Sequence, residues 1–313
     1  MQTPKIKHRK LGSLSAPIRL AVRPTLLLTA LLTALLAALL APSCSSTLKS
    51  DSAAPDSVGT DSPRGSGSVV TGKILVSAAS SLTLPFTQIT EGFLKAHPGA
   101  EVTLNFGSSG QLATQIKQGA PADLAAFADA APMKELAGAG LIVEPVQVFA
   151  RNQLALVTAA TAQNQIDSLS DLAGRVTLGN LGTVSLCEET APCGKYARQA
   201  LAAAGVRIPE RNITRGSDAR ATLRAVTEGD ADVAIIYVTD ALLATADPRT
   251  ATRIESVAIP EEFNITSTYV MAEITQDSSG TAASNNPVAQ AFMQYVLSRS
   301  GQKLLSEAGF LSP

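Results

Sequence analysis

The stretch KILVSAASSLTLPFTQITEGFLKAHPGAEVTLNFGSSGQLATQIKQGAPADLAAFA, residues 73–128, decides the fold class. Three short apolar runs in it predict strands, at 73–79, 101–107 and 123–128. Between these runs, residues 82–97 and 109–119 place apolar side chains at helical spacing. The resulting βαβαβ order is typical of an open α/β sheet with parallel strands and helices on its faces.

The same alternation continues beyond this stretch. Further strands are expected at 153–160, 175–180, 231–238, 253–260 and 267–274. Further helices are expected at 194–205, 218–230 and 287–309. Residues 71–313 therefore hold two α/β units of similar size. In such folds ligands bind outside the carboxyl ends of the strands, close to helix N-termini.

Composition excludes several classes of function. The chain has 313 residues and a formal net charge of -1, but residues 1–43 contain six Lys or Arg and no Asp or Glu. The remaining residues therefore carry 19 basic and 26 acidic side chains. This acidic balance, with 4% aromatic residues, argues against a nucleic-acid partner. Only two histidines occur, His8 and His97, which excludes a His-rich metal site.

The N-terminal region has the order of an export signal. In residues 1–43, a basic part ends at Arg23 and an apolar run extends from Thr25 to Ala41. A transmembrane anchor is the alternative, although the run is short for a span. Cys44 follows it as in a bacterial lipoprotein signal, which predicts lipidation of Cys44, with plain secretion as the alternative. Residues 44–70, rich in Ser, Gly, Asp and Pro, predict a flexible tether.

The two remaining cysteines, Cys187 and Cys193, lie close together in the sequence LCEETAPC. Outside the cytoplasm such a pair suggests a disulfide. A metal site is the alternative, but two cysteines without a nearby histidine provide only half of a zinc site.

Four predicted helices open with small residues. They begin at Ser80-Ser81, Gly107-Ser108-Ser109-Gly110, Ala191-Pro192-Cys193-Gly194 and Ser217-Asp218-Ala219-Arg220. Small residues let a ligand approach the backbone, and free N–H groups, hydroxyls and the helix dipole together favour an anion. The alternative is that each serine only caps its helix. Tyr237, at the end of 231–238, is either a core aromatic residue or a phenol that donates into a cleft.

Three titratable residues, Asp123, Asp129 and His97, occur near these segments of the sequence. Asp123 and Asp129 flank the end of a predicted strand, as helix caps or as carboxylates at the sheet edge. An anion site is expected to keep both at a distance. His97 lies at a predicted helix-to-strand turn and is expected at the surface.

The chain resembles bacterial molybdate-binding proteins, which are the solute-binding subunits of ABC importers. The resemblance covers nearly all of residues 73–311. It is carried by 76–86, 105–129, 191–201, 217–241 and the C-terminal helix. The pattern GSSGxLxxQIxxGAPADLxxxAD, which residues 107–129 match, is specific for this family.

The resemblance implies a two-lobe periplasmic-binding-protein fold of type II, with the ligand in a cleft between the lobes. Lobe 1 is expected to comprise 71–152 plus 239–313, and lobe 2 is expected to comprise 153–238. Five residues are implied to bind molybdate: the Ser81 and Ser109 hydroxyls, the Cys193 and Ala219 backbone N–H groups, and the Tyr237 hydroxyl. The family often has Ala where this chain has Cys193, which a backbone donor tolerates.

The implied function is capture of molybdate, and of tungstate, for delivery to the membrane permease of an ABC transporter. The protein is then no enzyme and has no cofactor, and molybdenum enters only as the bound oxyanion. It is expected to be a monomer that is exported and is either lipid-anchored outside the cell membrane or periplasmic. A binding protein for sulfate or phosphate is one alternative. A serine hydrolase using Ser81 or Ser109 is a remote one, since no suitable base is visible near either serine. A membrane-coupled sensor domain is a third.

Overall fold

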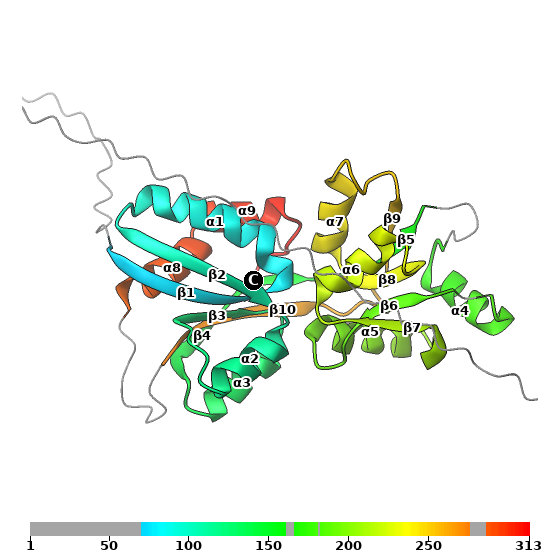
Figure 1. Cartoon of the computed structure of the whole chain (residues 1–313), viewed down its shortest axis with the longest axis horizontal. Coiled ribbons are helices and arrows are strands. Elements are labelled where there is room, and N and C mark those ends of the chain that lie inside the picture. Colours follow the sequence, from blue (N-terminus) through cyan, green and yellow to red (C-terminus); the bar gives the residue numbers. More distant parts are fainter. Residues whose placement is uncertain (1–69, 161–165, 181, 276–285) are drawn as a thin grey trace, which may run out of the picture. The chain divides into compact units, whose positions relative to one another are not determined.

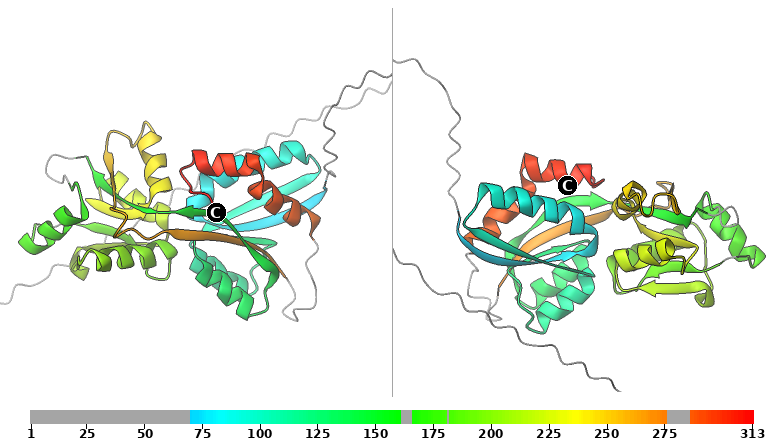
Figure 2. Two further views of the ribbon diagram at one scale, coloured as in Figure 1. Left: turned by 180° about the vertical axis from the view of Figure 1, so that it is seen from behind. Right: turned by 45° about the horizontal axis from the view of Figure 1, so that its top comes forward.

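The computed structural model describes residues 70–160, 166–180, 182–275 and 286–313 (Figures 1 and 2). This part of the chain forms two five-stranded sheets, each with helices on both faces. The predicted export signal, Cys44 and the tether up to residue 69 lie outside the described residues. Within the described part, none of the helices has the length and hydropathy to cross a bilayer.

The first sheet has the strand order β2-β1-β3-β10-β4. Its strands are β1 (Gly72–Ala79), β2 (Ala100–Gly107), β3 (Leu124–Phe127), β4 (Ile142–Asn152) and β10 (Ser267–Ile274). The pairs β1·β2 and β1·β3 are parallel, whereas β10 is antiparallel to both β3 and β4. One side carries α1 (Thr83–Ala96), α8 (Pro287–Leu297) and α9 (Arg299–Glu307). The other side carries α2 (Ser109–Lys117) and α3 (Ala130–Gly138).

The second sheet has the order β7-β6-β8-β5-β9. Its strands are β5 (Leu154–Ala159), β6 (Val184–Cys187), β7 (Ile213–Gly216), β8 (Val233–Tyr237) and β9 (Ile254–Ala258). Its helices are α4 (Leu169–Leu178), α5 (Pro192–Ala203), α6 (Ala219–Glu228) and α7 (Val238–Ala246). Buried residues of α4 and α5 pack on one side of the sheet, and those of α6 and α7 pack on the other.

Successive side chains of the central strands point to opposite faces, and both faces are buried. In β8, Val233, Ile235 and Tyr237 join one core cluster, while Ala234 and Ile236 join another. The continuous apolar sequence of β8 follows from burial on both faces. The same period fixes the direction of Tyr237, which points to the α5 side of the sheet.

The chain passes between the two sheets twice. Only Gln153 separates β4 from β5, and residues 259–266 connect β9 to β10. The predicted return to the first lobe at residue 239 is too early, because β9 pairs with β5 in the second sheet and α7 packs against both. We use "first half" and "second half" below for the elements of the first and second sheets.

One predicted strand, at 175–180, is wrong. Most of this segment belongs to α4, whose first turn is capped by Ser168 through the Asp171 amide. Gly179, with φ 70°, ends the helix in the left-handed conformation. These two signals outweigh the strand propensity of Val176 and Thr177. The strand that occupies this place in the second sheet is β6.

Two other differences concern segment ends and missed strands. The predicted helix at 287–309 is divided at Ser298, which is extended and caps α9 through the Gly301 amide. Strands β4 and β7 were not predicted. Glu144 and Pro145 interrupt the apolar pattern of β4, and β7 has only four residues.

Candidate functional site

A small cavity lies where strand ends of both sheets meet helix N-termini. It encloses about 10 Å³, and most of its lining residues are small or hydroxylated. All five predicted site residues line it: Ser81, Ser109, Cys193, Ala219 and Tyr237. The other lining residues are Ala79, Ser80, Gly107, Ser108, Ala128, Ala191, Pro192 and Asp218. The structure therefore brings together predicted site residues that are up to 156 positions apart in the sequence, from Ser81 to Tyr237.

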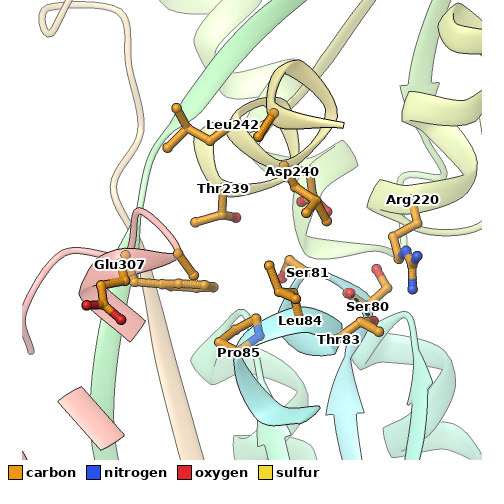
Figure 3. Close-up of a pocket in the computed structure, with 14 residues that line it drawn as sticks. Ser80, Ser81, Thr83, Leu84, Pro85, Arg220, Thr239, Asp240, Leu242 and Glu307 are labelled. Atoms are coloured by element: carbon orange, nitrogen blue, oxygen red, sulfur yellow. Dashed lines mark hydrogen bonds between the residues drawn. The ribbon is translucent and has the colours of Figure 1, made fainter. Parts of the chain in front are cut away.

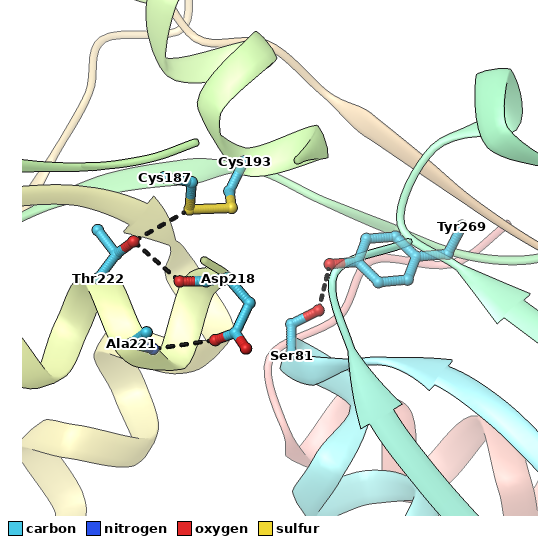
Figure 4. The surroundings of a disulfide bond; sticks show 7 residues. All are labelled: Ser81, Cys187, Cys193, Asp218, Ala221, Thr222 and Tyr269. Atoms are coloured by element: carbon cyan, nitrogen blue, oxygen red, sulfur yellow. Dashed lines mark hydrogen bonds between the residues drawn. A yellow bond between two sulfur atoms is a disulfide. The ribbon is translucent and has the colours of Figure 1, made fainter. Parts of the chain in front are cut away.

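Ser81 reaches the cavity from the short 3-10 helix η1 (Ser80–Leu82), which directly follows β1. Its Oγ lies 2.8 Å from the hydroxyl oxygen of Tyr269 (Figure 4). The Tyr269 hydroxyl accepts a hydrogen bond from Asn152 Nδ2 at 3.3 Å, and the same amide donates to Thr239 Oγ1 at 2.9 Å. When Tyr269 donates its own proton to Ser81, the Ser81 proton is available to a ligand.

Ser109 is the first residue of α2 and is almost completely buried. Its Oγ accepts a hydrogen bond from the Ala128 amide at 3.1 Å, which fixes the oxygen at the cavity wall. The hydroxyl proton is then directed away from the amide and can be donated. The neighbouring Ser108 also lines the cavity, and its buried Oγ has no partner among the described residues. Ser108 is not among the five predicted site residues, because the sequence marks it only as part of a helix start.

Cys193 and Ala219 lie in the first turns of α5 and α6. Helix geometry leaves the first four N–H groups of a helix without a partner in that helix. At α6 the Asp218 side chain accepts from the Ala221 amide at 2.9 Å, so this cap occupies an amide other than that of Ala219. The dipoles of both helices add partial positive charge at the same end. The first turns of α5 and α6 in the second half therefore both present main-chain donors.

The predicted disulfide between Cys187 and Cys193 is present, with an S–S distance of 2.01 Å. It joins the end of β6 to the first turn of α5 (Figure 4). Thr222 Oγ1 of α6 donates to Cys187 Sγ at 3.3 Å. A side chain at Gly194 would come within 2.2 Å of the Glu188 carbonyl oxygen, so this turn accepts only glycine. The backbone around Cys193 is therefore held by a covalent bond and by close packing.

Tyr237 is 2% exposed, and its hydroxyl has no partner among the described residues. Its ring meets that of Tyr269 at a centroid distance of 5.8 Å. Burial, followed by the proximity of Tyr269, raises the pKa of the Tyr237 phenol well above its ordinary value. The phenol therefore stays protonated and can donate a hydrogen bond at every physiological pH. Of the two alternatives for Tyr237, burial of the ring confirms a core aromatic residue, and this residue also lines the cavity.

Charged side chains are scarce around the small cavity. Asp218 is the one acidic residue on its described wall, and no Lys or Arg lines it. An adjoining cavity of about 290 Å³ shares Ser80 and Ser81 with it and is also lined by Arg220 and Asp240 (Figure 3). A ligand in the small cavity would therefore be surrounded mainly by neutral donors.

Of the three other titratable residues, His97 and Asp123 are absent from the wall of the small cavity, but Asp129 directly follows Ala128 of that wall, so the expectation that an anion site keeps Asp129 at a distance is not met. His97 stacks on Phe93 at a ring distance of 4.6 Å and is partly buried instead of fully exposed. Asp123 accepts from the Leu75 amide at 2.7 Å, and Asp129 caps α3 through the Ala131 amide at 2.9 Å. Within the described ranges, no group of three or more His, Cys, Asp or Glu side chains could hold a metal ion.

Two α/β halves joined by two crossing segments, with a polar cavity between strand ends of both sheets, define a solute-binding protein of the two-lobe periplasmic type. The sequence matches the family described as bacterial extracellular solute-binding protein over residues 74–311, and the chain belongs to this family.

Named relatives agree with this assignment. The chain is 34% identical to the molybdate-binding protein ModA of Mycobacterium tuberculosis (strain ATCC 25618 / H37Rv), over 77% of this chain and 85% of that protein. It is 29% identical to ModA of Haemophilus influenzae, over 76% and 89%. The solved periplasmic molybdate-binding protein of Azotobacter vinelandii superposes with a TM-score of 0.64 at 20% identity, over 77% of this chain and 99% of that one, which supports the fold. The resemblance found in the sequence is thereby confirmed.

Proposed function

We propose that this protein captures molybdate, and also tungstate, outside the cytoplasm and delivers it to the permease of an ABC importer. The observation that carries the proposal is the small cavity, where two serine hydroxyls, a buried phenol and two helix N-termini meet. The ModA relatives support molybdate as the ligand. The five proposed donors are Ser81, Ser109, Cys193, Ala219 and Tyr237.

Charge supports a fully deprotonated tetrahedral dianion. Such an ion has only acceptor oxygens, and the proposed donors are all uncharged O–H or N–H groups. Hydrogen bonds to a charged ligand contribute roughly 1.5–3 kcal/mol each, so five of them give tight binding after ordering costs. Phosphate carries a proton near neutral pH and needs an acceptor. The five proposed donors offer no acceptor, although Asp218 on the described wall, whose Oδ1 accepts from Ala221, has a second carboxylate oxygen.

The size of the ion supports discrimination against sulfate. The donors come from both halves of the molecule, and the cavity of about 10 Å³ between them has room for about one water, so the halves must move apart to admit an oxyanion that reaches all of the donors. Sulfate has the same charge and shape as molybdate but is smaller. It therefore leaves some donors without a partner, and buried donors without a partner are costly.

The proposal extends to the location of the protein. The export signal and Cys44 support a monomeric lipoprotein that is held at the outer face of the cell membrane by residues 44–70. A protein attached in this way stays close to a membrane permease. Mass spectrometry of the protein purified from its host membrane tests this part, because a diacylglycerol-modified Cys44 is expected.

The function is tested by calorimetric titration of the purified protein with molybdate, tungstate, sulfate and phosphate. We expect tight binding of the first two, weaker binding of sulfate and no measurable binding of phosphate. Tighter binding of sulfate than of molybdate would replace the proposed ligand by the alternative one. Absence of binding for all four oxyanions would reject an oxyanion carrier.

A further inference from the structure

An ion pair joins the two halves of the molecule beside the small cavity. Lys195 Nζ of α5 lies 2.5 Å from Asp129 Oδ2 at the start of α3. Asp129 directly follows Ala128, and Lys195 comes two residues after Cys193, and both Ala128 and Cys193 line the cavity. The ion pair therefore connects the two opposing walls of the proposed binding site.

Asp129 is well placed for this contact. Its side chain is only 8% exposed, and its other oxygen accepts from the Ala131 amide at 2.9 Å. The phenol of Tyr196, next to Lys195, lies beside the same carboxylate: burial first, and the charge of Asp129 second, raise the pKa of Tyr196 above its ordinary value. A carboxylate buried to this degree needs a cationic partner, because an unpaired buried charge is costly.

Two further contacts lie along the same edge. A side chain at Gly110 of α2 would come within 2.5 Å of the Thr190 carbonyl oxygen in the second half. Next to it, Gln111 Nε2 lies 3.4 Å from Glu188 Oε2. The first turn of α2 thus meets the loop between β6 and α5, which the Cys187–Cys193 disulfide closes, and Asp129 at the start of α3 meets α5 itself.

We infer that Lys195 and Asp129 form a latch that holds the two halves together around the bound oxyanion. In the same contact Lys195 neutralises Asp129, whose charge would otherwise repel a dianion one residue away. Both are positioning residues and neither is assigned a contact with the ligand. This inference rests on the proposed function for its ligand, but the contact between the halves can be measured without one.

The decisive variant is Asp129→Asn, because two explanations predict opposite signs. Asparagine keeps the helix cap but loses the ion pair. If Asp129 acted only as a charge near the site, its removal would strengthen binding of a dianion. If it acts as half of the latch, binding weakens, and we expect the Kd for molybdate to rise about fivefold or more, mainly through faster dissociation.

Three further variants test the ion pair: Lys195→Gln, Lys195→Arg and Arg198→Gln. Lys195→Gln is expected to weaken binding about tenfold, and Lys195→Arg, which keeps the charge and the reach, to restore most of it. Arg198→Gln removes the same charge from the same helix, but its partner Glu189 belongs to the same half, so a change below about twofold is expected. The double variant Asp129→Asn/Lys195→Gln is expected to bind no more weakly than Lys195→Gln alone.

Small-angle X-ray scattering tests the contact between the halves in the absence of a ligand. The Asp129→Asn and Lys195→Gln proteins are expected to have a larger radius of gyration than the wild-type and Arg198→Gln proteins. Equal radii in all four, or an Asp129→Asn protein that binds molybdate as tightly as the wild type, would overturn the latch. If the wild type binds none of the oxyanions, the proposed function fails, and scattering alone decides on the latch.

Discussion

The two walls of the small cavity are built from different chemical groups. The first half contributes the hydroxyl side chains of Ser81 and Ser109, at the ends of β1 and β2. The second half contributes the first turns of α5 and α6, where Cys193 and Ala219 present main-chain amides, and adds the phenol of Tyr237. One wall depends on the identity of side chains and the other depends mainly on backbone geometry.

The two walls therefore differ in the amino-acid substitutions that they tolerate. A serine hydroxyl is lost with one substitution, whereas an amide donor survives every substitution except proline. Substitutions can therefore test the two walls separately.

The strongest way to break the second wall is Ala219→Pro. Ala219 is the first residue of α6, where proline is favoured, and Asp218 before it is already extended, with φ -154° and ψ 179°. The helix should therefore form, but the amide is lost and the proline ring takes its place at the cavity. We expect the Kd for molybdate, measured by calorimetry, to rise about 100-fold or more. Ala219→Gly keeps the amide, and a comparable loss in that variant would contradict a backbone role.

The matching change in the first wall is Ser109→Ala, with an expected rise in Kd of about tenfold or more. The substitution removes one proposed donor and leaves the Ala128 amide without its acceptor. Ser185→Ala is the matched control: Ser185 is also fully buried, its Oγ has no partner among the described residues, and it does not line the cavity. Calorimetry that gives the same molybdate affinity for Ser109→Ala and the wild type would remove Ser109 from the site.

Much of the first half could be predicted from the sequence, because its signals are local. The alternating runs of β1 and β2 and the helical spacing of α1 and α2 lie in one uninterrupted stretch. The candidate residues were found in the same way, as small or hydroxylated residues at strand ends. Their assembly around one cavity was implied by resemblance, since no local pattern places Ser81 beside Tyr237.

Most errors in the predicted secondary structure concern the second half, where local and long-range preferences disagree. The strand propensity near Val176 gave way to the Ser168 cap and to Gly179, and the short β6 was missed. The assignment of β9 depends on its pairing with β5, nearly 100 residues away, which no periodicity shows. The latch between Asp129 and Lys195 was missed for the same reason: each residue alone is an ordinary cap or surface lysine.

Tyr237 and Tyr269 differ in the hydrogen-bond partners of their hydroxyl groups. Tyr237→Phe removes a hydroxyl that has no partner in the described structure, so we expect weaker molybdate binding, about fivefold to tenfold, without loss of thermal stability. Tyr269→Phe removes a hydroxyl bonded to Ser81 and Asn152, so the melting temperature should fall as well. Calorimetry and thermal unfolding of both variants test this. A Tyr237→Phe protein that melts earlier but binds normally would make Tyr237 a purely structural residue.

The smallest effect is expected from Asp240, which lines the adjoining cavity but not the small one. It is 4% exposed, and its Oδ2 has no partner among the described residues. Burial raises the pKa of Asp240 from 3.8 to about 7, while nearby Arg220 opposes this rise and Asp218 adds to it. Because the pKa is higher in the folded than in the unfolded protein, the stabilising contribution is complete below about pH 4 and is lost as the pH rises through 7.

Asp240→Asn isolates this contribution, because asparagine stays neutral at every pH. The measurement is the difference in melting temperature between the wild type and Asp240→Asn from pH 4 to pH 8.5, which cancels other groups such as Glu273, whose pKa is also raised by burial. The wild type should lose stability relative to the variant as the pH rises from about 4 to 7, and the difference should level off above 7. A difference that stays constant over this interval would mean that Asp240 is ionised throughout. Molybdate affinity should change little, because Asp240 does not line the small cavity.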